Sequence, residues 1–114
     1  MATVKCTLNA GITIKDVVHL EAEIREATAA DLIDATDESE KLVRTPDGYE
    51  LLASPTLVGL NTLRRQIVRI GEYKGPLSIA ELKKLTATDL SLLQEKAVQL
   101  ENASLEEVKD RGES

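Results

Sequence analysis

The residue types that most often carry catalysis or bind metals are scarce in this sequence. It has one cysteine, Cys6, and one histidine, His19. Cys6 alternates with Val4 and Leu8, which predicts a small apolar side chain packed under a strand instead of a nucleophile. His19 falls on the polar face of a predicted strand beside Glu21, with no partners for a catalytic constellation, so we expect a solvated side chain. One histidine and one cysteine cannot form a zinc site. The sequence therefore predicts no catalytic, metal-binding or cofactor-binding residues and no enzymatic activity.

Two further patterns have the residue types of ligand sites but not their spacing. Gly71 and Gly75 bracket residues 72–74 without the strand-to-helix context and Lys-Ser/Thr pair of a phosphate loop. A carboxylate run lacks the twelve-residue calcium-loop pattern, so we interpret it as an exposed helix face. The run comprises Asp31, Asp34, Asp37, Glu38 and Glu40.

A basic cluster in the middle of the chain leaves two interpretations open. Its members are Arg64, Arg65, Arg69, Lys83 and Lys84. One interpretation is contact with nucleic acid, because two short helices after a longer one can imitate a helix-turn-helix. The other is contact with an acidic protein surface, or with the acidic segment 16–50 of a neighbouring copy. The net charge of −6 and the pI near 4.8 favour a protein partner over nucleic acid.

Length and composition restrict the class of protein. A chain of 114 residues predicts one domain, residues 1–114. Aromatic residues make up 2% of it, so the core must be aliphatic, and base-stacking platforms for single-stranded nucleic acid are nearly ruled out. No apolar run approaches the roughly 20 residues that span a bilayer, and no signal peptide opens the chain. We therefore expect an intracellular protein without a membrane partner.

The N-terminal residues 3–25 alternate apolar and polar side chains, which is typical of strands. Asn9-Ala10-Gly11 is a plausible turn, because glycine accepts a positive φ. We expect two or three antiparallel strands whose apolar face is covered by helices.

The remainder contains repeated helix-start signals. Thr28 and Asp31 form a capping-box pattern that predicts a helix over about 29–41. Ser54 followed by a proline predicts a helix that continues to Ile70. Two more capping patterns start at Ser78 and Thr86, each with a carboxylate three residues later. The apolar stripes of the two longer helices comprise Leu57, Leu60, Leu63, Ile67 and Ile70 in one, and Leu90, Leu93, Ala97 and Leu100 in the other.

These elements predict an α+β fold that is mainly α. A small N-terminal antiparallel sheet of two to three strands is followed by three to four short amphipathic helices. We expect residues 3–25 to be β-rich, residues 28–103 to be helical and residues 104–114 to form a polar, frayed tail. A Thr-Pro-Asp-Gly turn at 45–48 leaves two options for residues 41–53, a hairpin or a loop between helices.

Several stretches resemble a known family. They are EIREATAADL at 23–32, LRRQIVRIG at 63–71, GPLSIAEL at 75–82 and LTATDL at 85–90. In type and order they resemble the tail assembly chaperones of Mu-like and related contractile-tailed phages, over about residues 4–100. The resemblance depends on overall pattern and includes no catalytic motif.

The resemblance implies a late viral protein that acts in the host cytoplasm and is absent from the mature virion. Such chaperones are thought to coat the long helical tape-measure protein, keep it soluble and recruit tail-tube subunits. A longer product of ribosomal frameshifting is common in the family. Homo-oligomers are compatible with the sequence, and nucleic acid is not an expected partner. The alternative is a small phage DNA-binding or regulatory protein with a helix-turn-helix-like C-terminal half.

If the protein works by shielding apolar surface, its amphipathic stripes and basic cluster are the candidate contacts. The same apolar residues could instead form the core of the chain. The candidate partner-binding residues are Leu57, Leu60, Arg64, Arg65, Ile67, Arg69, Leu90, Leu93 and Leu100.

Overall fold

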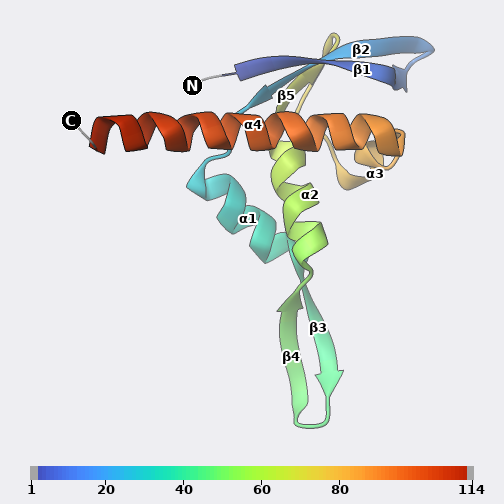
Figure 1. Cartoon of the computed structure of the whole chain (residues 1–114). Helices are drawn as coiled ribbons and strands as arrows, with labels where there is room; N and C mark the ends of the chain where they lie inside the picture. Colours follow the sequence, from blue (N-terminus) through green and yellow to red (C-terminus); the bar gives the residue numbers. More distant parts are fainter. Residues whose placement is uncertain (1–2, 113–114) are drawn as a thin grey trace.

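The computed structural model describes residues 3–112, which form a four-stranded sheet, a separate two-stranded hairpin and four helices (Figure 1). In chain order the elements are β1 (Thr3–Ile14), β2 (Val17–Arg25), α1 (Ala29–Ser39), β3 (Glu40–Thr45), β4 (Gly48–Ala53), α2 (Pro55–Gln66), β5 (Ile67–Ile70), β6 (Tyr73–Lys74), α3 (Ile79–Leu82) and α4 (Ala87–Gly112).

The α+β class is confirmed, but the emphasis on helices is not. Helices account for 46% and strands for 37%, so the fold is mixed and not clearly mainly α. The difference lies in the segment 28–103, expected to be helical, which also contains β3, β4, β5 and β6. Residues 41–53 take the hairpin option, with Thr45 paired to Gly48 across a two-residue connection.

The first two strands form a hairpin whose turn is not where the sequence pattern placed it. Lys15 and Asp16 both have positive φ, 52° and 64°, as the favoured two-residue hairpin turn requires. The predicted turn at Asn9-Ala10-Gly11 is wrong. Those residues belong to a bulge in β1, where residues 8–11 face the single residue Leu20 of β2.

Strand β5 replaces the end of a predicted helix. The helix α2 ends at Gln66, and the chain continues as a strand that pairs antiparallel with β2. Ile24 faces Ile67, and the register then shifts so that Val68 is the extra residue. This bulge brings Ile67 and Ile70 into the same buried face, although a regular strand would put residues three apart on opposite faces. The helix-like spacing in the sequence therefore comes from a bulged strand.

The local helix-start signals are confirmed where the structure tests them. Thr28 and Ser78 each form a capping box with the carboxylate three residues later, and Ser54 caps α2 with Pro55 in its first turn. The helix α4 runs to Gly112, so it includes residues 104–112 of the predicted tail; the last two residues of that tail lie outside the described part. The early helix ends at Ser39 and not at about 41.

The core lies where α4 crosses the inner face of the sheet (Figure 1). It is aliphatic, as the composition predicts. Its buried members are Cys6, Leu8, Ile12, Ala22, Ile24, Leu63, Ile67, Ile70, Leu77, Leu82, Leu93 and Leu100. The helices α1 and α2 pack against each other on the other side of α4 (Figure 1).

The hairpin β3–β4, which we call the arm, projects away from the helices (Figure 1). All of its residues except Thr45 are exposed. The radius of gyration is 16.4 Å, against about 13 Å expected for a compact chain of this length. The principal extents are 52 × 48 × 21 Å, so the molecule is a flat slab with an arm.

Candidate partner-binding surface

The basic cluster of α2 is neutralised by the acidic helix α1 of the same chain. Arg64 Nη2 lies 2.5 Å from Glu38 Oε2, and Arg65 pairs with the other oxygen of that carboxylate. Hydrogen bonds from Arg64 and then Arg65 lower the pKa of Glu38. The arginine side chains are only 17% and 14% exposed. Within the described chain, segment 16–50 therefore supplies an acidic partner for these two arginines.

A buried polar network next to these ion pairs also connects α1 with α2. Asn61 donates from Nδ2 to Ser39 Oγ over 2.9 Å and accepts at Oδ1 from Arg64 Nε over 2.9 Å. Ser39 in turn donates to the carbonyl of Ala35, and Arg64 donates to the carbonyl of Leu77. Because the polar groups are paired, the network can be buried without a large desolvation penalty. It fixes the base from which the arm projects.

Arg69 and Arg25 also have partners in the chain. Arg69 Nε donates to Glu23 Oε2 over 3.0 Å along the face of the sheet. Arg25 binds Asp31 with two nitrogens, at 2.6 and 2.9 Å, and ties the end of β2 to the start of α1. The hydrogen bond from Arg25 is the main reason why the pKa of Asp31 falls to about 2. Arg69 is thus a strand residue and not a member of a helical basic face.

The structure separates the predicted apolar contact residues into two groups. Ile67, Leu93 and Leu100 are buried in the core. Leu57, Leu60 and Leu90 are half-buried, and Leu60 and Leu90 pack against that core. The large apolar side chains that stay exposed lie outside the two predicted stripes.

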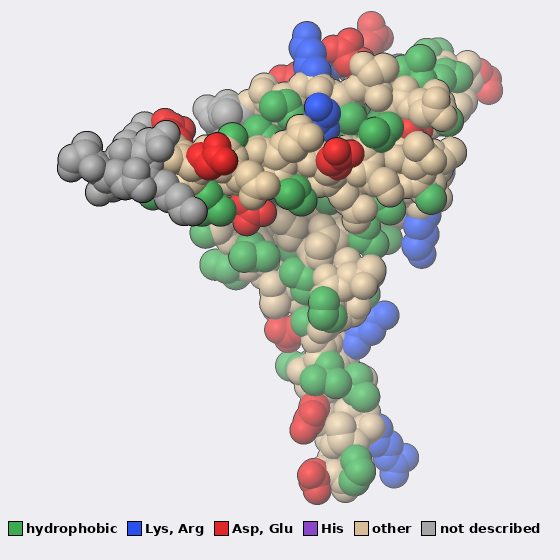
Figure 2. All heavy atoms as spheres, viewed as in Figure 1, with side chains coloured by type: hydrophobic (Ala, Val, Ile, Leu, Met, Phe, Trp, Pro, Cys, Tyr) green, Lys and Arg blue, Asp and Glu red, His purple; other side chains and the backbone are tan. Residues whose placement is uncertain are grey.

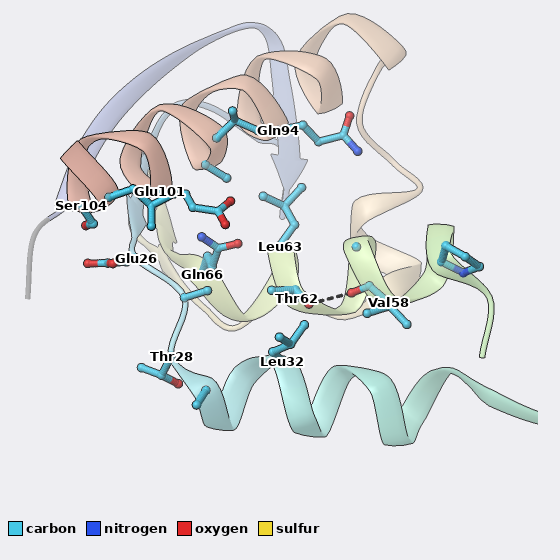
Figure 3. A pocket seen from close by; sticks show the side chains of 17 residues that line it. Glu26, Thr28, Leu32, Val58, Thr62, Leu63, Gln66, Gln94, Glu101 and Ser104 are labelled. Carbon is cyan, nitrogen blue, oxygen red and sulfur yellow. Dashed lines mark hydrogen bonds between the residues drawn. The ribbon is translucent and has the colours of Figure 1, made fainter. Parts of the chain in front are cut away.

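A groove with a volume of about 780 Å³ lies between α4 on one side and α1 and α2 on the other (Figure 3). Leu32 of α1, 52% exposed, forms one wall. Val98 and Leu105 of α4, 53% and 56% exposed, form the opposite wall. Val58, Gly59, Thr62, Leu63 and Gln66 of α2 lie between them, and Figure 3 shows Glu26 and Glu101 near one end.

The arm carries the second exposed apolar surface. Leu42 and Leu51 face each other across the two strands, and Tyr49 lies on the same side. Figure 2 shows hydrophobic side chains on the arm interspersed with charged ones. The arm pairs with no other strand in the described part of the chain, so its outer edges are available to a partner.

Within residues 3–108 the structure brings together no group of three or more His, Cys, Asp or Glu side chains that could hold a metal ion. Cys6 is buried, as predicted, and burial raises the pKa of its thiol. His19 is half-buried, and its ring packs against Gly71, where a side chain would collide with it. No helix in the described part of the chain is both long and apolar enough to cross a membrane.

Sequence reasoning missed the groove because its lining comes from three helices that are far apart along the chain. One signal was available: Val98 and Leu105, the exposed apolar residues of α4 that line the groove, lie seven residues apart and outside the core stripe. The other residues of α4 that line it are Gln94, Ala97, Glu101 and Ser104, of which Ala97 also packs against the core. A second apolar stripe on one helix indicates a second contact surface.

Comparisons with known proteins agree on one family. The family described as "Tail assembly protein gp41" matches residues 8–113. The chain is 41% identical over 109 residues to "Mu-like prophage FluMu protein gp41" of Haemophilus influenzae, covering 95% of this chain and 86% of that protein. It is 45% identical over 76 residues to "Probable tail assembly protein gp41" of Escherichia phage Mu, covering 67% of this chain and 53% of that one. No solved structure matches.

Proposed function

The chain belongs to the Mu-like tail assembly protein gp41 family, and from this premise we propose that it is a tail assembly chaperone that binds the tape-measure protein. A role in phage tail assembly follows from the relatives' names, while the chaperone role and the partner are our proposal. The chain spans about half of the length of the phage Mu relative, so the proposal concerns the part of the protein present here.

The open apolar groove is the observation that carries the proposal. A protein that shields a partner needs apolar surface that its own fold leaves uncovered, and solvent-exposed charge that opposes aggregation. The groove walls and the arm supply the first, and the net charge of −6 supplies the second. Many copies along one long rod gain avidity from effective concentration, so weak individual contacts suffice. Neither binding nor release in this scheme requires a chemical step.

The pairing of the arginines is the reason to propose a protein partner in preference to nucleic acid. Phosphate contacts need exposed cations, whereas Arg64 and Arg65 are mostly buried against Glu38. The basic residues that remain exposed near them, Lys83 and Lys84, follow the four-residue helix α3. A regulator with a helix-turn-helix is therefore the weaker of the two functions.

The same proposal covers where the chain acts, what it recruits and when it is released. The chain acts in the host cytoplasm, recruits tail-tube subunits directly or through a longer frameshifted product, and leaves before the virion is complete. Self-association along the tape-measure protein is compatible with this scheme. None of these steps calls for a cofactor or a membrane.

Co-expression with the tape-measure protein of the same phage or prophage tests the function. We expect a several-fold increase in the soluble tape-measure protein and its co-purification with this chain. An unrelated acidic protein of similar size is the control for a nonspecific effect. Unchanged solubility without a complex would overturn the proposal, as would tight binding to duplex DNA in physiological salt.

A further inference from the structure

Gly59 occupies an unusual place in α2. It lies in the interior of the helix, where glycine destabilises the helical state relative to alanine. It is exposed and lines the groove, and a Cβ atom built there would meet no heavy atom within 4 Å. Nothing in the described chain therefore requires a glycine at this position. A partner that packs closely against α2 would need a small residue here.

The shape of the groove indicates what kind of element approaches. The wall formed by α4 presents Val98 and Leu105, seven residues apart on one side of the helix. Leu32 presents an apolar side chain from the facing helix. The ridges of neighbouring helices can accept a further helix, and a small residue at the crossing shortens the distance between the helix axes.

The charges at the groove indicate which charged residues should lie beside the apolar stripe of that helix. Glu26 and Glu101 line it, and neither forms an ion pair with a residue in the described part of the chain. An incoming helix with Lys or Arg beside its apolar stripe would pair with these carboxylates. An acidic helix would be repelled by them and by the net charge of the chain.

We propose that the groove binds one amphipathic helical segment of the tape-measure protein. A small residue of that helix lies over Gly59, its apolar stripe lies between Leu32 and Val98, and its basic residues face Glu26 and Glu101. This binding mode rests on the proposed function, which supplies the partner. The helix-in-groove mode then sets the specificity, because only segments that combine a small residue, aliphatic neighbours and positive flanks fit.

Overlapping peptides that cover the tape-measure sequence are the probe, measured by fluorescence anisotropy against the full chain. At least one basic amphipathic peptide should bind and gain helical circular dichroism. Gly59→Leu, which fills the groove, should weaken that binding at least tenfold. Gly59→Ala is the matched control: it should bind within threefold of the original chain and raise the midpoint of unfolding.

Two further variants change residues of α4, so that the test does not depend on α2 alone. Val98→Asp, on the opposite wall, should weaken the same peptide at least tenfold while the circular dichroism of the chain stays unchanged. Glu101→Lys should weaken it as well, and exchange of a facing peptide lysine for glutamate should restore binding. Undiminished binding to Gly59→Leu and Val98→Asp would overturn the proposal.

The failures of the two proposals are distinguishable. If the original chain leaves the tape-measure protein insoluble, the proposed function fails. If the original chain and Gly59→Leu solubilise it equally, only the groove proposal fails. Conversion of a dimer to a monomer by Gly59→Leu, with peptide binding unchanged, would assign the groove to a second copy and overturn the proposal.

Discussion

The carboxylate of Asp89 lies 2.8 Å from the amide nitrogen of Gly11, although 78 residues separate the two along the chain. It also accepts hydrogen bonds from the amides of Asn9 and Ala10, at 2.6 and 3.0 Å. Burial opposes the charge of this carboxylate, but these amides and the Thr86 hydroxyl outweigh it, so the pKa of Asp89 is lowered. The first turn of α4 thus holds the bulge of β1 in place.

Replacing Asp89 with alanine should lower the free energy of unfolding by about 3 kcal/mol, because three amide donors lose their acceptor. Asp89→Asn should have a smaller effect, since its carbonyl oxygen can keep two of the donors. Urea denaturation followed by circular dichroism measures both. Glu95→Ala, at an exposed position of the same helix, is the control, with an expected change within about 0.5 kcal/mol. Equal effects at the two positions would contradict the role of the bulge contact.

The pair formed by Arg25 and Asp31 should make stability depend on pH. The carboxyl of Asp31 has its pKa lowered from 3.8 to about 2, so its stabilising effect is complete above 3.8 and is lost as the pH falls toward 2. The shift corresponds to about 2 kcal/mol. Asp31→Asn should therefore be less stable near pH 7 and should approach the original chain near pH 2.

Denaturant titrations at a series of pH values measure this effect. As a control, Asp34→Asn changes an exposed residue of the same helix, and its free energy of unfolding should depend on pH in the same way as that of the original chain. A constant difference between Asp31→Asn and the original chain at every pH would show that the ion pair is not the cause.

The ion pairs of Glu38 with Arg64 and Arg65 should stabilise the chain only weakly, and their effect should depend on salt. Glu38→Gln should cost about 1 kcal/mol, because the carboxylate is 44% exposed and water screens the pair. The loss should shrink in 1 M NaCl. Arg64→Ala should cost more, about 2 kcal/mol, since the Leu77 carbonyl and Asn61 also lose a donor. Thermal unfolding at two salt concentrations separates the variants, with Asp37→Asn as the exposed control.

The arm should contribute little to global stability. Combined Leu42→Ser and Leu51→Ser changes remove the exposed apolar pair, and the free energy of unfolding should change by no more than about 0.5 kcal/mol. Leu93→Ala, in the core, should cost about 3 kcal/mol. Denaturation in guanidinium chloride compares the two. A large loss from the double change would mean that the arm packs against the rest of the chain in solution.

Local signals in the sequence predicted the helix starts well, because a cap depends on residues three apart. Thr28, Ser54 and Ser78 all begin helices as expected. Cys6 was also placed correctly, since strict alternation fixes which side of a strand is buried. The aliphatic core followed from composition alone.

Two of the errors share a physical cause, which is a bulge in a strand. At Val68 the bulge gives β5 the spacing of a helix, and at residues 8–11 it resembles a turn. The second bulge is held by Asp89, which no local window contains. The groove as a whole could not be read from local pattern either, because α1, α2 and α4, which line it, lie far apart along the chain.

The pairing of β2 with β5 places Arg25 and Ile67 at neighbouring points of the sheet, so residues 26–66 depart and return at one place. Chain added at the far end of this excursion, between Asp47 and Gly48, changes neither strand register nor core. An epitope or fluorophore inserted there would travel with the molecule through an assembling tail while the groove stays clear. A longer or shorter connection at this point would likewise leave the sheet beneath it unchanged.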